Sequence, residues 1–145
     1  MFFSQLIVGT VLICITVVIH AVVLDRLIYY IETYSNPARL RFGRGWKVPM
    51  LTIAVLGTFA AHILQIWLWA IFYISVGEFH NLEAALYFST STFTTVGFGD
   101  VVLDEKWRLV SSFQSANGFI LFGWSTAFIF EIMNRLYKHD ELGQD

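Results

Sequence analysis

The sequence predicts an all-α membrane protein with three transmembrane helices and one re-entrant helix that leads into a glycine-containing loop. Three observations lead to this fold class. The 145 residues are 57% hydrophobic and only 14% charged, a balance typical of membrane proteins. Aromatic residues make up 17% of the chain, as expected for the belts at membrane interfaces. Three apolar runs are long enough to cross a bilayer, and a fourth is too short to do so.

Composition also argues against several classes of function. The net charge is −2, and no long basic run indicates a nucleic-acid-binding surface. The single cysteine, Cys14, cannot form an intrachain disulfide. Hydroxyls, acids and histidines occur, but they do not assemble into a nucleophile, base and orienting group. The sequence therefore predicts neither an enzyme nor a bound cofactor.

The first element covers residues 1–34. Its first 24 residues carry no charge, which is enough to span a bilayer core of about 20 residues. The start lacks the positive region and the cleavage site of a signal peptide, so we expect a retained transmembrane helix with a polar extension. His20 is the one ionisable group near the end of the apolar run, and we expect it to be neutral and packed near the interface.

Residues 35–47 are predicted to form a basic cytoplasmic loop. Ser35-Asn36-Pro37 should end the first helix. Four basic residues and no acid follow, and the positive-inside rule then places the N-terminus outside. These side chains could also contact anionic lipid headgroups, with a plain topology signal as the alternative. The four residues are Arg39, Arg41, Arg44 and Lys47.

The second span is predicted over residues 48–76, with Pro49 tolerated in its first turn. Gly57 and Ala61 form a pair of small residues where another helix could approach closely. His62 and Gln65 are polar at membrane depth, so we expect them to face protein and to hydrogen bond between helices. One histidine without cysteine or carboxylate neighbours makes a poor metal site.

The short apolar segment, residues 82–93, is too short to span and suits a re-entrant helix inside the protein. Asn81 is a plausible N-cap, and Glu83 lies in the first turn, where negative charge is favoured. The C-terminal end of this helix carries partial negative charge from the peptide dipoles. That end therefore favours a cation.

The segment that follows is Thr94-Thr95-Val96-Gly97-Phe98-Gly99-Asp100. Glycine reaches backbone conformations that other residues avoid. Its alternation with ordinary residues can aim successive carbonyls to the same side. Four copies around an axis would then stack rings of carbonyl oxygens, which can replace the water around a dehydrated potassium ion.

This segment resembles the selectivity filter of potassium channels, with Phe98 where the commonest version has tyrosine. The resemblance covers about residues 49–137, the two-helix pore module, and the first helix is an addition to that module. It is closest to the small prokaryotic type. It implies K⁺ coordination by the carbonyls of Thr95, Val96, Gly97 and Phe98 and by the Thr95 hydroxyl, within an ion-binding run that ends at Gly99.

The resemblance also implies which residues support the filter. Asp100 should bond to an aromatic residue on the pore helix, and Tyr87 holds that position. Phe88 should be a second member of the aromatic cuff, and Ser91 stands where some relatives carry an acid. The supporting set is Thr94, Asp100, Tyr87, Phe88 and Ser91. Because Phe98 has no hydroxyl, one usual anchor is missing and the filter should collapse more readily at low potassium.

The last helix is predicted over residues 107–137, about 46 Å at 1.5 Å per residue. The resemblance places the gating hinge at Gly118. On that alignment Phe122, Thr126 and Phe130 share one stripe at four-residue spacing and line the inner cavity. Four Phe130 side chains could close the pore by dewetting, with lipid-facing or interhelical packing as the alternative. Residues 138–145 should form a short cytoplasmic tail.

One chain carries one filter segment, and a pore needs four, so the sequence predicts a homotetramer with cyclic symmetry. The expected function is passive, potassium-selective conduction. Two alternatives stay open: a weakly selective cation channel, and a non-conducting accessory or scaffold subunit with a pore-like fold. The small size indicates a prokaryotic inner membrane, with the C-terminus in the cytoplasm.

Overall fold

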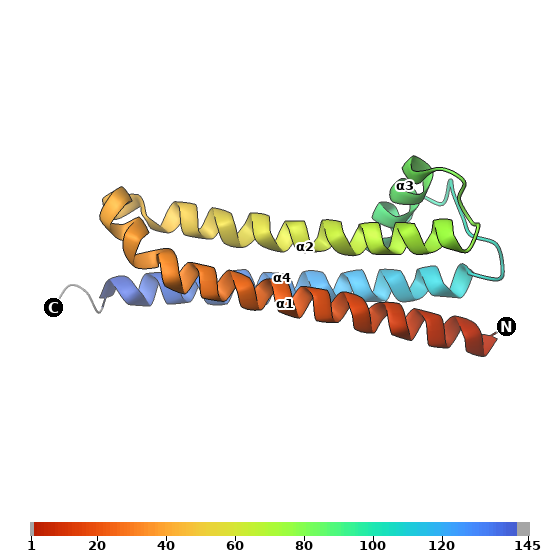
Figure 1. The fold of residues 1–145 in the computed structure, drawn as a ribbon, viewed down its shortest axis with the longest axis horizontal. Helices are drawn as coiled ribbons and strands as arrows, with labels where there is room; N and C mark the ends of the chain where they lie inside the picture. Colours follow the sequence, from red (N-terminus) through yellow and green to blue (C-terminus); the bar gives the residue numbers. More distant parts are fainter. Residues whose placement is uncertain (1, 142–145) are drawn as a thin grey trace.

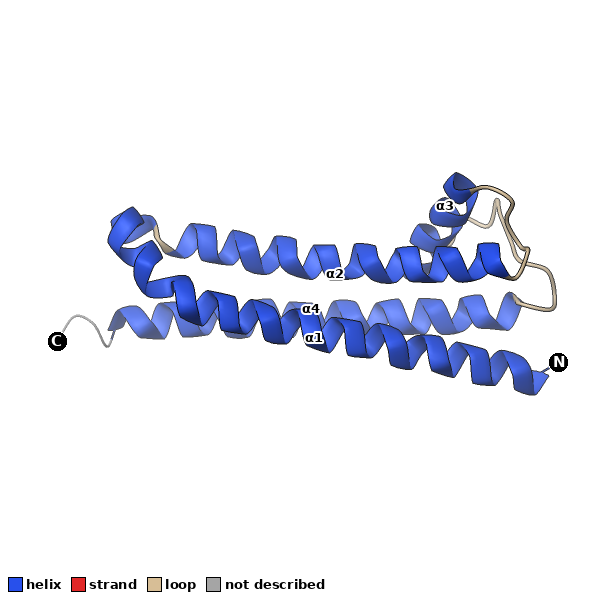
Figure 2. Cartoon of the chain, viewed as in Figure 1, coloured by secondary structure: helices blue, strands red, loops and turns tan. Residues whose placement is uncertain are grey.

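The computed structural model describes residues 2–141, and side chains up to residue 138. The elements follow in the order α1 (Phe2–Phe42), the 3₁₀ turn η1 (Gly43–Gly45), α2 (Lys47–Ser75), α3 (Leu82–Phe93) and α4 (Arg108–Glu141). Three long helices lie side by side, and α3 sits at one end of them (Figure 1). Every element of the described chain is helical (Figure 2). The predicted fold class is confirmed.

The two ends of the molecule carry different features. The N-terminus, α3 and the loops around α3 lie at one end (Figure 1). The connection between α1 and α2 lies at the other end, together with the last turns of α4. Each long helix has the length and hydropathy needed to cross a membrane. The chain thus passes along the same axis three times, with α3 as the short element at one end.

The predicted helix break at Ser35-Asn36-Pro37 is wrong, because α1 continues to Phe42 with Pro37 inside it. Proline removes one backbone donor and bends a helix without always ending it. The last turns of α1 do turn toward α2 (Figure 1). Ala38 is buried beyond the proline in the packing of this end, so tertiary contacts maintain the helix. The predicted loop 35–47 shrinks to residues 43–46.

The other helix bounds lie close to those predicted. The range of α3 is the predicted one, and α2 differs from its predicted range by one residue at each end. The last helix begins at Arg108 and runs on to Glu141. The first residues of the expected tail 138–145 are therefore helical, and residues 142–145 lie outside the described residues.

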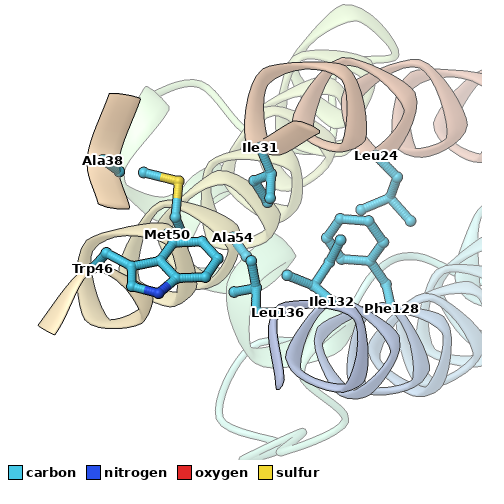
Figure 3. Close-up of a cluster of buried hydrophobic side chains, with 9 residues drawn as sticks. All are labelled: Leu24, Ile31, Ala38, Trp46, Met50, Ala54, Phe128, Ile132 and Leu136. Atoms are coloured by element: carbon cyan, nitrogen blue, oxygen red, sulfur yellow. The ribbon is translucent and has the colours of Figure 1, made fainter. Parts of the chain in front are cut away.

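Apolar side chains from all three long helices pack at the end opposite α3 (Figure 3). In a membrane this packing acts through close van der Waals contact, because lipid tails are as apolar as the side chains. A second cluster lies beside α3 and contains Trp69, Tyr73, Phe88, Phe93, Leu103, Val110 and Leu121. The first cluster contains Leu24, Ile31, Ala38, Trp46, Met50, Ala54, Phe128, Ile132 and Leu136.

α1 packs closely against both other long helices. At Gly57 of α2 an added Cβ would overlap the side chain of Leu27, and at Gly9 of α1 it would overlap Phe113 of α4. Small residues at these positions let the helices approach. The predicted close approach is thus confirmed at Gly57, where the neighbouring helix is α1. Ala61 is fully buried.

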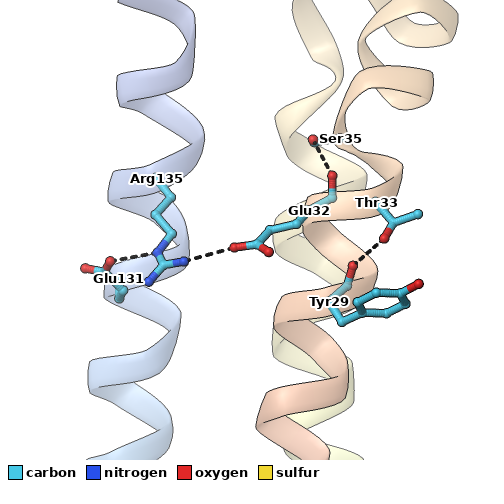
Figure 4. A network of polar contacts seen from close by, with 6 residues as sticks. All are labelled: Tyr29, Glu32, Thr33, Ser35, Glu131 and Arg135. Atoms are coloured by element: carbon cyan, nitrogen blue, oxygen red, sulfur yellow. Dashed lines mark hydrogen bonds and ion pairs between the residues drawn. The ribbon is translucent and has the colours of Figure 1, made fainter.

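An ion-pair network joins α1 and α4 at the end opposite α3 (Figure 4). Arg135 donates to Glu131, one turn earlier, at 2.8 Å, and to Glu32 of α1 at 3.1 Å. The first pair has the i, i+4 spacing that a helix brings together, whereas the second joins residues far apart in the sequence. The side chains are about half exposed, so each pair contributes less than about 1 kcal/mol in water.

Candidate functional site

The short helix α3 is held firmly at both ends. At its start the Asn81 side chain accepts a hydrogen bond of 2.7 Å from the backbone N–H of Ala84, so Asn81 is the predicted N-cap. Further along, the Ser89 hydroxyl donates to the Ile66 carbonyl of α2 at 2.8 Å. Gln114 of α4 donates to the Ser89 hydroxyl at 2.8 Å. Both α2 and α4 therefore hold α3 at Ser89.

The loop after α3 alternates between two backbone conformations. Positive φ values occur at Thr95 (61°), Gly97 (52°) and Gly99 (78°), whereas Val96 and Phe98 keep negative values. Alternation of this kind turns successive peptide planes so that their carbonyls can point to one side. Thr95 is β-branched, and such residues seldom adopt positive φ outside strained functional sites. The backbone here is held in place by its surroundings.

Hydrogen bonds from the loop N–H groups to α3 supply that restraint. The N–H of Thr95 donates to the Thr92 carbonyl, and the N–H of Gly97 donates to the Ser91 carbonyl, both at 3.0 Å. Within the described chain no donor is bonded to the carbonyls of residues 95–98. Buried or ordered carbonyls normally find a partner. These four oxygens therefore have no hydrogen-bond donor within the described chain, and each can accept a ligand.

Tyr87 and Asp100 fasten the far end of the loop. The Tyr87 hydroxyl donates to the Asp100 carboxylate at 2.7 Å, as the resemblance implies. The other carboxylate oxygen accepts from the Val101 N–H at 3.0 Å. The hydrogen bond to Asp100 raises the pKa of Tyr87, because ionisation of the hydroxyl would break the bond and bring two negative charges together. The Phe98 ring lies parallel to that of Tyr87, with centroids 6.2 Å apart.

Three further supporting residues act in ways that the sequence does not predict. Ser91 supports the loop through its carbonyl, and its hydroxyl turns back to the Phe88 carbonyl at 3.0 Å. Phe88 packs on Tyr73 of α2, with ring centroids 5.2 Å apart. Phe88 therefore joins α3 to α2. Its membership of an aromatic cuff around Asp100 stays a prediction. The Thr94 hydroxyl donates to the Thr90 carbonyl at 2.7 Å, which caps α3.

The predicted inner-helix stripe divides into two parts. Phe122 packs within the chain, with its ring centroid 4.6 Å from that of His62 and 5.5 Å from that of Phe93. Thr126 and Phe130 are exposed, Phe130 at 59%. The Phe122 ring is engaged by α2 and α3 within the chain, and its place in the lining of an inner cavity stays a prediction. Four-residue spacing drifts around a helix, so the three residues do not share one environment.

Gly118, the implied hinge, is buried against α3. An added Cβ at this position would overlap the backbone carbonyl of Phe93. The glycine therefore lets α4 approach the residue that immediately precedes the loop. This close contact is a packing role that the resemblance does not indicate.

A buried polar cluster between α1, α2 and α4 is the feature that sequence reasoning largely missed. His62 and Gln65 do bond between helices, as predicted. His20, however, is fully buried near the middle of α1, against residues of α2 and α4. The signal was available, since polar residues at membrane depth on all three spans should meet. The members are Thr16, His20, His62, Gln65, Asn117 and Ser125.

The four basic residues of the predicted loop lie at the end opposite α3. Arg39 and Arg41 are in the last turn of α1, Arg44 is in η1, and Lys47 opens α2. The Lys47 ammonium lies 4.0 Å from the ring centroid of Tyr137. Basic charge and the oriented carbonyls thus occupy opposite ends of the molecule.

A family model described as an ion channel matches residues 50–135. The match covers most of α2, all of α3 and the loop, and most of α4, and it leaves α1 outside. No curated protein and no solved structure matches the chain. The matched family is one of channels, which conduct ions without catalytic groups. Because the match covers more than half of the chain, the protein belongs to this family of ion channels.

Proposed function

We propose that the protein conducts K⁺ passively and selectively across a membrane through a homotetrameric pore. The observation that carries this proposal is the alternating backbone of residues 95–99, with four carbonyls that no described donor uses. Peptide oxygens in this arrangement can replace the hydration shell of K⁺. They thereby offset the free energy that the ion loses when it leaves water. The Thr95 hydroxyl would add the innermost ligand.

The need for symmetry supports a tetramer. The carbonyls of one chain can form only one edge of a coordinating ring, so further copies must supply the rest. Val96 and Phe98 are 54% and 68% exposed in the single chain, although they lie in the loop that a pore would enclose. A closed cyclic assembly would bury both. The pore axis would then run beside residues 95–98 of each chain.

Charge supports one orientation in the membrane. The four basic residues gather at the end opposite α3, which the positive-inside rule assigns to the cytoplasm. The loop and the N-terminus would then face outward, and the end of α4 would face inward. Anionic headgroups would meet Arg39, Arg41, Arg44 and Lys47, at about 1 kcal/mol each near the surface. A prokaryotic inner membrane is the location we propose.

A weakly selective cation channel is the second candidate, and Phe98 is the observation that favours it. Its ring has no hydroxyl to bond outward, so the loop has fewer anchors around the ion path. A wider or softer ring of oxygens would discriminate less between K⁺ and Na⁺. Selectivity measurements separate this candidate from the first.

Flux from liposomes tests the proposal directly. Purified protein in potassium-loaded vesicles should release K⁺, and Ba²⁺ should block the release. Gly97→Ala should abolish the flux, because alanine at a φ of 52° is strained by about 1–2 kcal/mol in each chain. Gly45→Ala is the matched control, since an added Cβ there meets nothing within 4 Å. An intact tetramer without flux would instead indicate a non-conducting subunit.

A further inference from the structure

Six polar side chains from three helices meet inside the bundle at membrane depth. The most exposed of them are 6% exposed, and three are completely buried. Polar groups in this environment are costly unless each finds a partner. An ionisable residue inside a membrane bundle is a candidate functional site with a partner to be identified. The bonds between these six residues show what that partner is.

Four of the six form a closed ring of hydrogen bonds, which we call the polar ring: His20, Ser125, His62 and Gln65. The Ser125 hydroxyl oxygen lies 2.9 Å from Nε2 of His62 and 3.3 Å from Nε2 of His20. On the other side Gln65 lies between the two Nδ1 atoms, at 3.2 Å from each. The ring therefore connects α1, α2 and α4.

A backbone carbonyl fixes the direction of every bond in the polar ring. The Thr16 carbonyl can only accept, so the amide nitrogen of Gln65 faces it at 3.2 Å. That nitrogen also donates to Nδ1 of His20, which must then be unprotonated. The amide oxygen of Gln65 consequently accepts from Nδ1–H of His62.

The remaining two bonds follow from these assignments. His20 carries its proton on Nε2 and donates it to the Ser125 hydroxyl oxygen. The Ser125 hydroxyl in turn donates to Nε2 of His62, which is unprotonated. Each donor meets one acceptor only while both imidazoles are neutral. A proton added to Nδ1 of His20 would face the Gln65 amide N–H, and one added to Nε2 of His62 would force the Ser125 hydroxyl to turn away and accept from both histidines.

Nothing else in the described surroundings offers a charge to compensate an added proton. The titratable groups that face the polar ring are the two histidines themselves, whose ring centroids are 5.2 Å apart. From α3 the neighbour is Phe93, 5.8 Å from His62. From α4 the neighbours are Phe122 and Trp124, at 4.6 Å from His62 and 5.2 Å from His20 respectively.

The polar ring lies beside the parts of the pore module that would have to move. Phe93 is the last residue of α3, directly before the loop. Asn117 donates to the Thr16 hydroxyl at 2.7 Å, so α1 holds α4 at Asn117 as well as at Ser125. The segment between these two attachments contains Gly118 and Gly123. A bend of α4 within this segment would strain or break one attachment.

We propose that the polar ring is a proton-sensitive switch that ties α1 and α2 to the inner helix α4 and thereby regulates conduction. This inference rests on the proposed function. With both histidines neutral, α1 holds α4 on both sides of the glycine-containing segment. A proton added to Nδ1 of His20 breaks the ring at Gln65, and one added to Nε2 of His62 reverses the bond at Ser125, so either change weakens the hold of α1 and α2 on this segment. Histidine is the side chain whose ordinary titration lies near physiological pH.

The test combines unfolding in detergent with K⁺ flux, each between about pH 8 and about pH 4, a range that extends below the ordinary titration of histidine. Because the ring excludes protons that an unfolded chain would bind, stability should be full at the high pH and fall as the pH drops. His20→Gln/His62→Gln removes both titrating groups and should flatten this fall. His80→Gln, in the exposed loop before α3, is the matched control and should behave as wild type.

The K⁺ flux should change about tenfold between the two pH values, which corresponds to about 1.4 kcal/mol in the equilibrium of the switch. The double variant should lose this change and His80→Gln should keep it. Ser125→Ala retains both histidines but removes the bond to α4, so it should also lose the change. This variant keeps the test decisive if the double variant does not fold.

Three outcomes would overturn the proposal. The first is a pH dependence of stability that is the same in wild type and in the double variant. The second is a double variant or a Ser125→Ala variant whose flux responds to pH as the wild-type flux does. The third is pH-dependent stability with pH-independent flux, which would leave the ring as a structural contact only. Absence of flux at every pH contradicts the proposed function instead. The pH dependence of unfolding then tests the polar ring separately.

Discussion

Gly118 of the inner helix packs directly against the backbone carbonyl of Phe93, the last residue of α3. The carbonyl-bearing loop begins one residue later. A side chain could rotate away from an added Cβ, but a backbone oxygen held in a helix end cannot. The contact therefore fixes the distance between α4 and the start of the loop.

Gly118→Ala should lower the free energy of unfolding by about 1–3 kcal/mol, the usual cost of overpacking. Unfolding of the purified protein in detergent measures this change. Gly123→Ala is the control on the same helix, because its Cβ would meet nothing within 4 Å. That substitution should be neutral or stabilise by up to about 1 kcal/mol, since alanine favours helix. Equal losses in the two variants would contradict the packing role.

Tyr73→Phe should destabilise the link between α2 and α4. The Tyr73 hydroxyl donates to the Gln114 side-chain oxygen at 2.7 Å, and both residues are fully buried. Without the hydroxyl this oxygen is left unsatisfied, at a cost of about 1–3 kcal/mol. Tyr34→Phe, at an exposed position of α1, should change stability little. The prediction fails if denaturation midpoints for the two variants coincide.

Phe98→Tyr should make the loop more resistant to potassium removal. The Phe98 ring is exposed in the single chain and lies beside Tyr87. A hydroxyl at this position could bond outward, at about 0.5–1.5 kcal/mol for each chain, and fourfold symmetry would multiply the effect. We expect slower loss of flux after exposure to potassium-free buffer. Unchanged kinetics of loss would show that the missing hydroxyl is not the weak point.

The parts of the site that depend on local sequence could be predicted. The N-cap at Asn81 and the bounds of α3 follow from side-chain chemistry and length, and the structure has both. The conformations of Gly97 and Gly99 follow from the freedom of glycine. Such features need only neighbours along the chain, which a sequence displays directly.

The parts that depend on packing between helices could not be predicted. A proline normally indicates a helix end, but Pro37 lies inside α1 because the residues beyond it are packed. His20 is expected near an interface because it lies near the end of the apolar run; the sequence shows polar residues on the other spans but not that Gln65 and Ser125 are the ones that contact it. The inward position of Phe122 depends likewise on His62 and Phe93, from two other helices.

The most direct test of the central claim is the reversal potential of purified protein in a planar bilayer with K⁺ on one side and Na⁺ on the other. If oriented carbonyls of residues 95–98 take over the solvation of K⁺, the potential should lie close to the K⁺ equilibrium value. A reversal potential near zero, with current carried equally by Na⁺, would contradict the account.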